Sequence, residues 1–193
     1  MNPIIYDIEI AHCIPPADDA ERQPGIEYCA GWHDYAGMGI ALITAYDIWP
    51  AEPRVFMGDN LAAFAELIAA RDAVIGFNNY RFDDRVLEAN GIRLQEGKGI
   101  DLAALIWRAA GVPQGEHPSG MGLEAICHAN KLPGKRGHGA MAPILYQTGR
   151  FGELIDYGLT DTLITLRLYR YLQINGGCRD PRNGEWLNVP VPR

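Results

Sequence analysis

The amino-acid sequence predicts an α/β fold in which a mixed β-sheet is flanked by helices. Two features predict this class. The N-terminal third contains extended apolar stretches joined by short polar segments, as in an antiparallel sheet, whereas the rest alternates a short apolar strand with helical patterns. The chain has 193 residues, a length that suits one domain with a sizeable core. We expect this domain to span residues 1–175 and an irregular tail to span residues 176–193, where prolines and glycines gather.

Three extended segments should open the chain. The run from Ile4 to Ile10 is rich in β-branched residues and alternates around two acids, which indicates a core strand. A polar, proline-containing loop should follow over residues 15–24. Two more strands are expected over residues 26–33 and 39–49, joined by a hairpin at residues 34–37. The first three strands would then be antiparallel.

The remaining segments predict helices with one further strand between them. Asp59 or Asn60 can cap the first helix, and Asp101 can cap a later one, because short polar side chains accept hydrogen bonds from exposed helical N–H groups. The apolar run at residues 73–77 should be a parallel strand. Helices are expected over residues 61–70, 81–90, 102–110, 123–130 and 151–172, with a loop over residues 131–139.

Composition and charge narrow the classes of function. The formal net charge is −7, which argues against a protein that coats nucleic acid through a basic face but not against an enzyme that binds it through metal ions. No apolar stretch approaches the ~20 residues of a membrane span, so we expect no membrane partner. The four cysteines are scattered, without metal-ligand spacing, which fits a reduced, cytoplasmic location.

The first candidate site is the pair Asp7 and Glu9 on the opening strand. Residues two apart on a strand point to the same face, so both carboxylates should lie together. Two such groups in a core repel each other and are costly to desolvate unless a cation lies between them. Oxygen ligands of this kind suit a hard divalent cation. Alternatively, the strand end reaches the surface and both acids are solvated.

A second polar cluster follows the strand at residues 73–77. Asn79, Asp83 and Asp84 lie between a strand and a helix, the kind of junction at which α/β folds place ligands. The sequence leaves open which of the two aspartates would serve as a ligand. The alternative is that both acids stabilise the helix N-terminus through the macrodipole.

A third cluster lies on the last predicted helix. Tyr157 and Asp161 are four residues apart and therefore share a helix face. Neighbouring apolar residues should bury this helix, and a buried aspartate is costly without a charge partner. Alternatively, Asp161 is exposed and Tyr157 packs with its hydroxyl in water.

The order and flanks of the three clusters resemble the DEDD superfamily of 3′–5′ exonucleases, which have a ribonuclease H-like fold. Asp-x-Glu lies on an N-terminal strand, Asn-x-x-Phe-Asp at a strand–helix junction and Tyr-x-x-x-Asp on a late helix. Tyr157 makes the chain similar to the tyrosine (DEDDy) branch and to polymerase-associated proofreading domains. The likeness runs from about Ile4 to Leu172.

This resemblance implies the roles of the site residues. Asp7, Glu9, Asp83 and Asp161 would hold two Mg²⁺ or Mn²⁺ ions, with Asp7 bridging them and Asp83 acting directly or through water. Such a pair of ions clamps the attacking and leaving oxygens of an in-line displacement. Tyr157 would orient the attacking water, because a phenol with a pKa near ~10 is a poor base at pH 7.

The implied substrate is a single-stranded DNA 3′ end, cleaved to nucleoside 5′-monophosphates, by an enzyme that stands alone or works with a separate replication or repair protein. The alternatives are an exoribonuclease of the same fold and a non-catalytic nucleic-acid-binding module. Substrate contacts are expected from residues near the three clusters and from the basic loop. They are Ile8, Ile10, Asn79, Lys135, Arg136 and His138. Phe77, Tyr80 and Trp107 could stack on a base, although core packing is favoured for Phe77 and Trp107.

Overall fold

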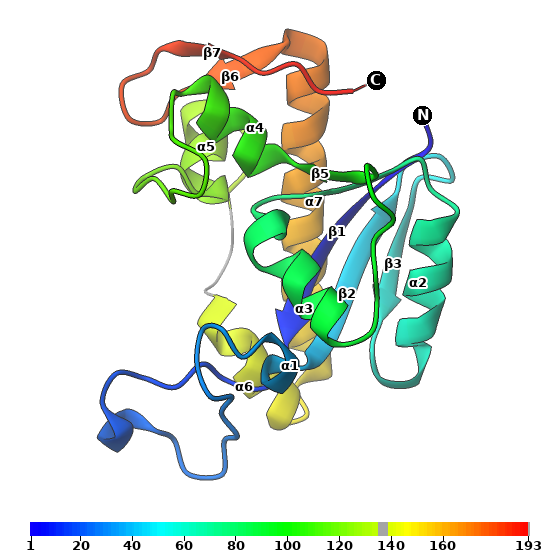
Figure 1. The fold of residues 1–193 in the computed structure, drawn as a ribbon, viewed down its shortest axis with the longest axis vertical. Helices are drawn as coiled ribbons and strands as arrows, with labels where there is room; N and C mark the ends of the chain where they lie inside the picture. Colours follow the sequence, from blue (N-terminus) through cyan, green and yellow to red (C-terminus); the bar gives the residue numbers. More distant parts are fainter. Residues whose placement is uncertain (135–138, 193) are drawn as a thin grey trace.

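The computed structural model describes residues 1–134 and 139–192 of the chain. Within these residues, a five-stranded sheet has the order β3-β2-β1-β4-β5 (Figure 1). Its strands are β1 (Pro3–Ile10), β2 (Ile40–Asp47), β3 (Glu52–Phe56), β4 (Ala73–Gly76) and β5 (Gly99–Asp101). The first three pair antiparallel, whereas β4 and β5 join parallel to β1. This mixed sheet confirms the predicted α/β, ribonuclease H-like architecture.

The strand expected over residues 39–49 is confirmed as β2, but the strand expected before it does not form, and β3 was not predicted. Residues 26–33, expected as a strand, hold a single bridge between Tyr28 and Cys13 and are otherwise irregular. The expected hairpin at residues 34–37 is instead the start of the helical turn α1 (Tyr35–Met38), because the Asp34 carboxylate accepts a hydrogen bond from the Gly37 N–H. The actual hairpin joins β2 to β3. Sequence missed β3 because three of its five residues are exposed and polar or proline, as an edge strand allows.

Helices cover both faces of the sheet. The N-terminal helices α2 and α3 pack on the face that carries Ile4, Tyr6 and Ile8, whereas α4, α5 and α7 pack on the face that carries Ile5. The short helix α6 was not predicted from the sequence, whereas the ends of the longer helices were predicted to within a few residues. The bounds are α2 (Leu61–Ala69), α3 (Asp83–Ala89), α4 (Leu102–Ala109), α5 (Leu123–Ala129), α6 (Ala142–Gln147) and α7 (Phe151–Asn175), with 3₁₀ turns at Asp19–Glu21, Gly58–Asn60, Asn79–Arg81 and Gly139–Met141.

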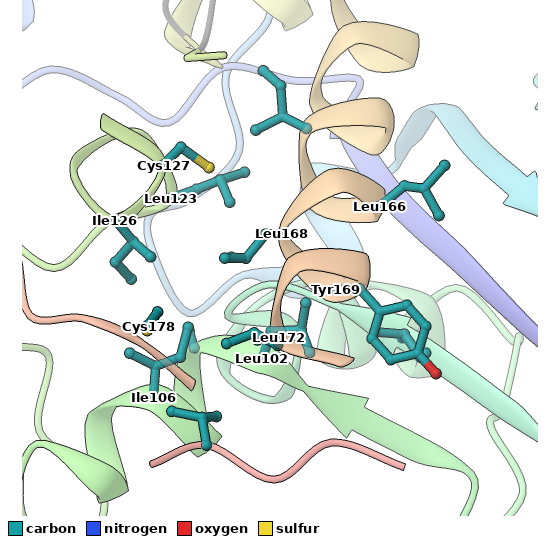
Figure 2. Close-up of a cluster of buried hydrophobic side chains, with 14 of the residues drawn as sticks. Leu102, Ile106, Leu123, Ile126, Cys127, Leu166, Leu168, Tyr169, Leu172 and Cys178 are labelled. Atoms are coloured by element: carbon teal, nitrogen blue, oxygen red, sulfur yellow. The ribbon is translucent and has the colours of Figure 1, made fainter. Parts of the chain in front are cut away.

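The long helix α7 is the axis of the larger core. Figure 2 shows side chains from α4, α5 and the C-terminal segment gathered around it, with Leu168 and Leu172 pointing into the cluster. The tail was expected to be irregular, but it forms the hairpin of β6 (Gly177–Arg179) and β7 (Trp186–Asn188). Buried Cys178 and Leu187 explain the difference, since they pack into the same core and fix the register of the two strands.

Two further features concern the environment of the chain. In the described residues, no helix is long and apolar enough to cross a membrane. All four cysteines are buried thiols, and burial raises the pKa of Cys178 to about 11, with Asp180 adding to the shift. A thiol with a raised pKa is poorly reactive at neutral pH, so Cys178 acts as an apolar core residue.

Candidate metal centre

Three carboxylates from two elements meet beside the end of β1. Asp7 and Glu9 lie on the same face of the strand as Ile5, and this face is covered by α7, which carries Asp161. One ligand oxygen from each of these three acids lies within 4.8 Å of the others. Glu9 and Asp161 are buried and Asp7 is half-buried. The strand and the helix thus bring two of the predicted clusters together.

A polar contact and a close approach hold α7 against the sheet at this point. Thr44 on β2 lies opposite Asp7 in the strand register, and its Oγ1 is 2.7 Å from Oγ1 of Thr162, the neighbour of Asp161. Both threonines are buried. One turn earlier, Gly158 lies so close to β2 that an added Cβ would be 2.9 Å from Leu42 Cδ2. This spacing fixes the height of the helix over the two acids of β1.

The parallel side of the sheet brings Asp83 to the same place. The pairing of β1 with β4 ends at Ile5, although β1 continues to Ile10, so N–H groups on that edge need other partners. Asp83, in the first turn of α3, accepts a hydrogen bond of 3.2 Å from the Ile8 N–H. Asp83 therefore lines the same cavity as Asp7 and Glu9.

A buried aspartate organises the junction before Asp83. Asp101 caps α4 as predicted, accepting from the Ala104 N–H. Its carboxylate also accepts from the N–H groups of Asn78, at 2.8 Å, and Tyr80, at 3.1 Å. Asp101 thereby fixes the loop between β4 and α3, on which the position of Asp83 depends.

The two adjacent aspartates of this junction point to different partners. Asp84 accepts hydrogen bonds from the Tyr6 hydroxyl and from Nδ2 of Asn79, on the α2–α3 side of the sheet. Asp83 faces the cavity, and burial, with a contribution from the Asp84 charge, raises its pKa to about 7. A cation in the cavity would favour its ionised form. Of the two, Asp83 is therefore the one that faces the cavity lined by Asp7 and Glu9.

Tyr157 stands at the edge of the carboxylate group. Its hydroxyl is hydrogen bonded to Asp161 and lines the cavity. Burial, followed by the charges of Asp161, Glu9 and Asp7, raises its pKa far above the usual value of a phenol. A phenol that stays protonated at all ordinary pH values can donate or accept a hydrogen bond but cannot serve as a base.

These residues fit a hard divalent cation. Among the residues that the structure describes, the candidate ligands are carboxylate oxygens, the donor type that Mg²⁺ and Mn²⁺ prefer. Buried carboxylates that lie close together repel one another, and a bound cation would offset that repulsion. The donor set and the burial together support a metal centre here.

The cavity extends well beyond the carboxylates. Its volume is about 660 Å³, in the range of sites that enclose a small ligand or part of a larger one. Ile8 and Ile10 line it, although both are largely buried. Sequence reasoning missed the opposite wall, formed by side chains from residues 11–39 and by the start of α6. These side chains are Cys13, Ile14, Pro15, Pro16, Glu21, Gln23, Tyr28, Trp32, Met141, Pro143 and Ile144.

Other expected substrate contacts have different positions. Asn79 is 1% exposed and packs over Gly76, where an added Cβ would be 2.8 Å from the Asn79 Cβ. It supports Asp84 instead of lining the cavity, which corrects its expected role as a substrate contact. Trp107 is buried, with its indole N–H donating to the Met121 carbonyl, and Phe77 packs against its edge. Lys135, Arg136 and His138 lie outside the described residues.

Comparison with known proteins supports the fold. No family profile and no curated protein sequence matches the chain. Among solved structures, it is similar to the family B DNA polymerase from the hyperthermophilic archaeon Pyrobaculum calidifontis, with a TM-score of 0.60 and 14% sequence identity. The match covers 89% of this chain but 24% of the polymerase, so the chain corresponds to about a quarter of that protein. At this identity the likeness establishes a shared fold.

Proposed function

We propose that this protein is a metal-dependent 3′–5′ exonuclease that hydrolyses single-stranded DNA ends to nucleoside 5′-monophosphates. The observation that carries the proposal is the convergence of Asp7, Glu9 and Asp161, whose ligand oxygens lie within 4.8 Å of one another. Asp83 and Tyr157 line the same cavity. The fold likeness to part of a DNA polymerase is consistent with the resemblance of the three motifs to proofreading domains.

Each residue of the site would have a separate role in the reaction. Asp7, Glu9 and Asp161 would hold the ions, and Asp83 would complete the set directly or through water. Two bound Mg²⁺ or Mn²⁺ ions would lower the pKa of the attacking water and stabilise the departing 3′ oxygen. Tyr157, fixed by its hydrogen bond to Asp161, would orient the water toward the phosphorus.

Two other functions use the same fold. An exoribonuclease would need contacts to the substrate 2′-hydroxyl. A non-catalytic binding module is less well supported, because the carboxylates and the net charge of −7 would repel phosphates in the absence of metal. A separate replication or repair protein remains a proposed partner.

The direct test is digestion of 5′-labelled single-stranded DNA and RNA with Mg²⁺ or Mn²⁺. We expect a ladder of products that shorten one nucleotide at a time, on DNA in preference to RNA. The Asp7→Ala variant should be inactive, whereas Asp59→Ala, an exposed aspartate in the turn before α2, should match the wild type. A ladder on RNA alone would favour the exoribonuclease, and an intact substrate with both metals would overturn the nuclease proposal.

A further inference from the structure

Residues 11–39 form an insert between β1 and β2 that carries one wall of the cavity. In Figure 1 the insert projects from the end of β1, on the side of α6. It contains five acids against one arginine, Arg22, so its net charge is −4 with histidines neutral. Such a segment repels phosphates. The wall that it presents to the cavity is largely apolar and aromatic, through Pro15, Pro16, Tyr28 and Trp32.

Hydrogen bonds fix the insert to the rest of the molecule. Cys13 and Glu27 are joined through their backbones at 3.0 Å. Gln147, at the end of α6, donates to the carbonyls of Ala11 and Glu27 and accepts from the Glu27 N–H. Both arms of the insert are therefore fixed to α6, whose start lines the same wall of the cavity.

Trp32 lies on a tightly bonded turn within this insert. The Asp34 carboxylate accepts from the N–H groups of Ala30, at 2.8 Å, and Gly37, at 2.9 Å. Trp32 is nevertheless 66% exposed and lines the cavity that the metal-site carboxylates also line. A large aromatic side chain that faces water from a well-bonded turn is available to a ligand.

We propose that Trp32 stacks on an unpaired base of the nucleic acid substrate and thereby positions the strand for cleavage. The inference rests on the proposed nuclease function, to which it adds a specific subsite. Because the insert is acidic, it would repel the phosphates of the strand. Its favourable contacts with the substrate should therefore be made to the bases. Stacking also tolerates any base, because every base presents an aromatic face, and this suits an enzyme that removes nucleotides in succession.

Two tryptophan variants test the role against a matched control. Trp32→Ala should raise KM for a single-stranded thymidine decamer by about 5- to 150-fold, the range expected for one lost stacked base, while kcat stays within about twofold. Trp32→Phe should recover most of the affinity because phenylalanine also stacks. Trp49→Ala is the control, since Trp49 is 71% exposed but lies in the β2–β3 turn, outside the cavity.

Abasic substrates separate stacking from other causes. Three decamers are compared, each with a single abasic nucleotide at a different one of the last three positions. For the decamer that lacks the stacked base, wild type and Trp32→Ala should have the same KM. An equal KM of both proteins on the intact decamer would overturn the inference and leave the nuclease proposal standing. A loss that persists equally with every abasic substrate would also overturn it.

Failure of the nuclease proposal would be visible separately. In that case the wild type would cleave nothing, and the Kd of a fluorescein-labelled decamer in Mg²⁺ becomes the readout. Weaker binding by Trp32→Ala than by Trp49→Ala would support the stacking subsite without catalysis. Equal binding, or no binding, would overturn the subsite as well.

Discussion

The replacement Asp83→Asn should stabilise the metal-free protein at neutral and alkaline pH. Burial raises the pKa of Asp83 from 3.8 to about 7. Asparagine has nearly the same shape, and its Oδ1 can still accept the hydrogen bond from the Ile8 N–H. The change therefore removes the charge while it keeps the contact that fixes the side chain.

The sign follows from the direction of the shift. A carboxyl whose folded pKa exceeds its unfolded pKa binds protons more tightly in the folded state, so its ionisation destabilises the fold. The penalty is absent below about pH 4, grows as the pH rises and is complete above about pH 7. Three pKa units at 1.36 kcal/mol each set an upper limit of about 4 kcal/mol. Because local relaxation and water reduce such penalties, we expect roughly 1–3 kcal/mol.

Thermal unfolding in EDTA at pH 5 and pH 8 measures this effect. Asp83→Asn should have a higher Tm than the wild type at pH 8, by roughly 5 °C, and a smaller difference at pH 5. Asp59→Asn is the control for loss of an exposed aspartate. Excess Mn²⁺ should then raise the Tm of the wild type more than that of Asp83→Asn. Equal stabilities of wild type and Asp83→Asn at pH 8 in EDTA would refute the reasoning.

Three other substitutions, one of them with a matched control, test the site and its supports. Tyr157→Phe should lower kcat roughly 100-fold with little change in calorimetric Mn²⁺ affinity, and full activity would exclude a role in orienting water. Asp84→Asn should keep turnover within a few-fold, since Asp84 bonds Tyr6 and not the cavity; an inactive but folded variant would make Asp84 a ligand. Gly158→Ala should destabilise by about 1–3 kcal/mol in urea unfolding because its Cβ would crowd β2. Gly152→Ala, with open space around it in the same helix, should stabilise by up to about 1 kcal/mol, and equal effects of the two would contradict the close approach.

The predictions from sequence succeeded where one physical signal was dominant. The strand at Ile4–Ile10 was evident because β-branched residues alternate with the acids. Asp101 was recognised as a cap because it directly precedes a helical pattern, and the structure confirms that bond. Parity on β1 and spacing on α7 also indicated which faces would carry the carboxylates. Local periodicity thus indicated which way each carboxylate points, but it could not give the distances between the carboxylates.

The failures occurred where tertiary contacts decide the local structure. The edge strand β3 has no apolar alternation because its outer face meets water. The extended pattern at residues 26–33 lacks a partner strand, since β2 occupies the edge of β1 on that side. The choice between Asp83 and Asp84 depends on where the β1–β4 pairing ends, which no local pattern contains. Trp32 was overlooked because its exposure and its place in the cavity arise from the fold of the whole insert.

The metal centre should also be part of the folding energetics. Glu9, Asp83 and Asp161 are buried and line the same cavity. Buried like charges reduce the stability of the fold in the absence of a cation. The contacts that hold them in place, such as the Thr44–Thr162 pair, lie at the same end of the sheet and must offset this repulsion. The larger apolar core lies around the distal part of α7 and the C-terminal hairpin. Any ion that binds the folded site in preference to the unfolded chain stabilises the fold by mass action. Metal removal should therefore loosen the end of the sheet that carries the carboxylates before it affects the core around Leu168 and Leu172, a difference that amide hydrogen exchange would resolve.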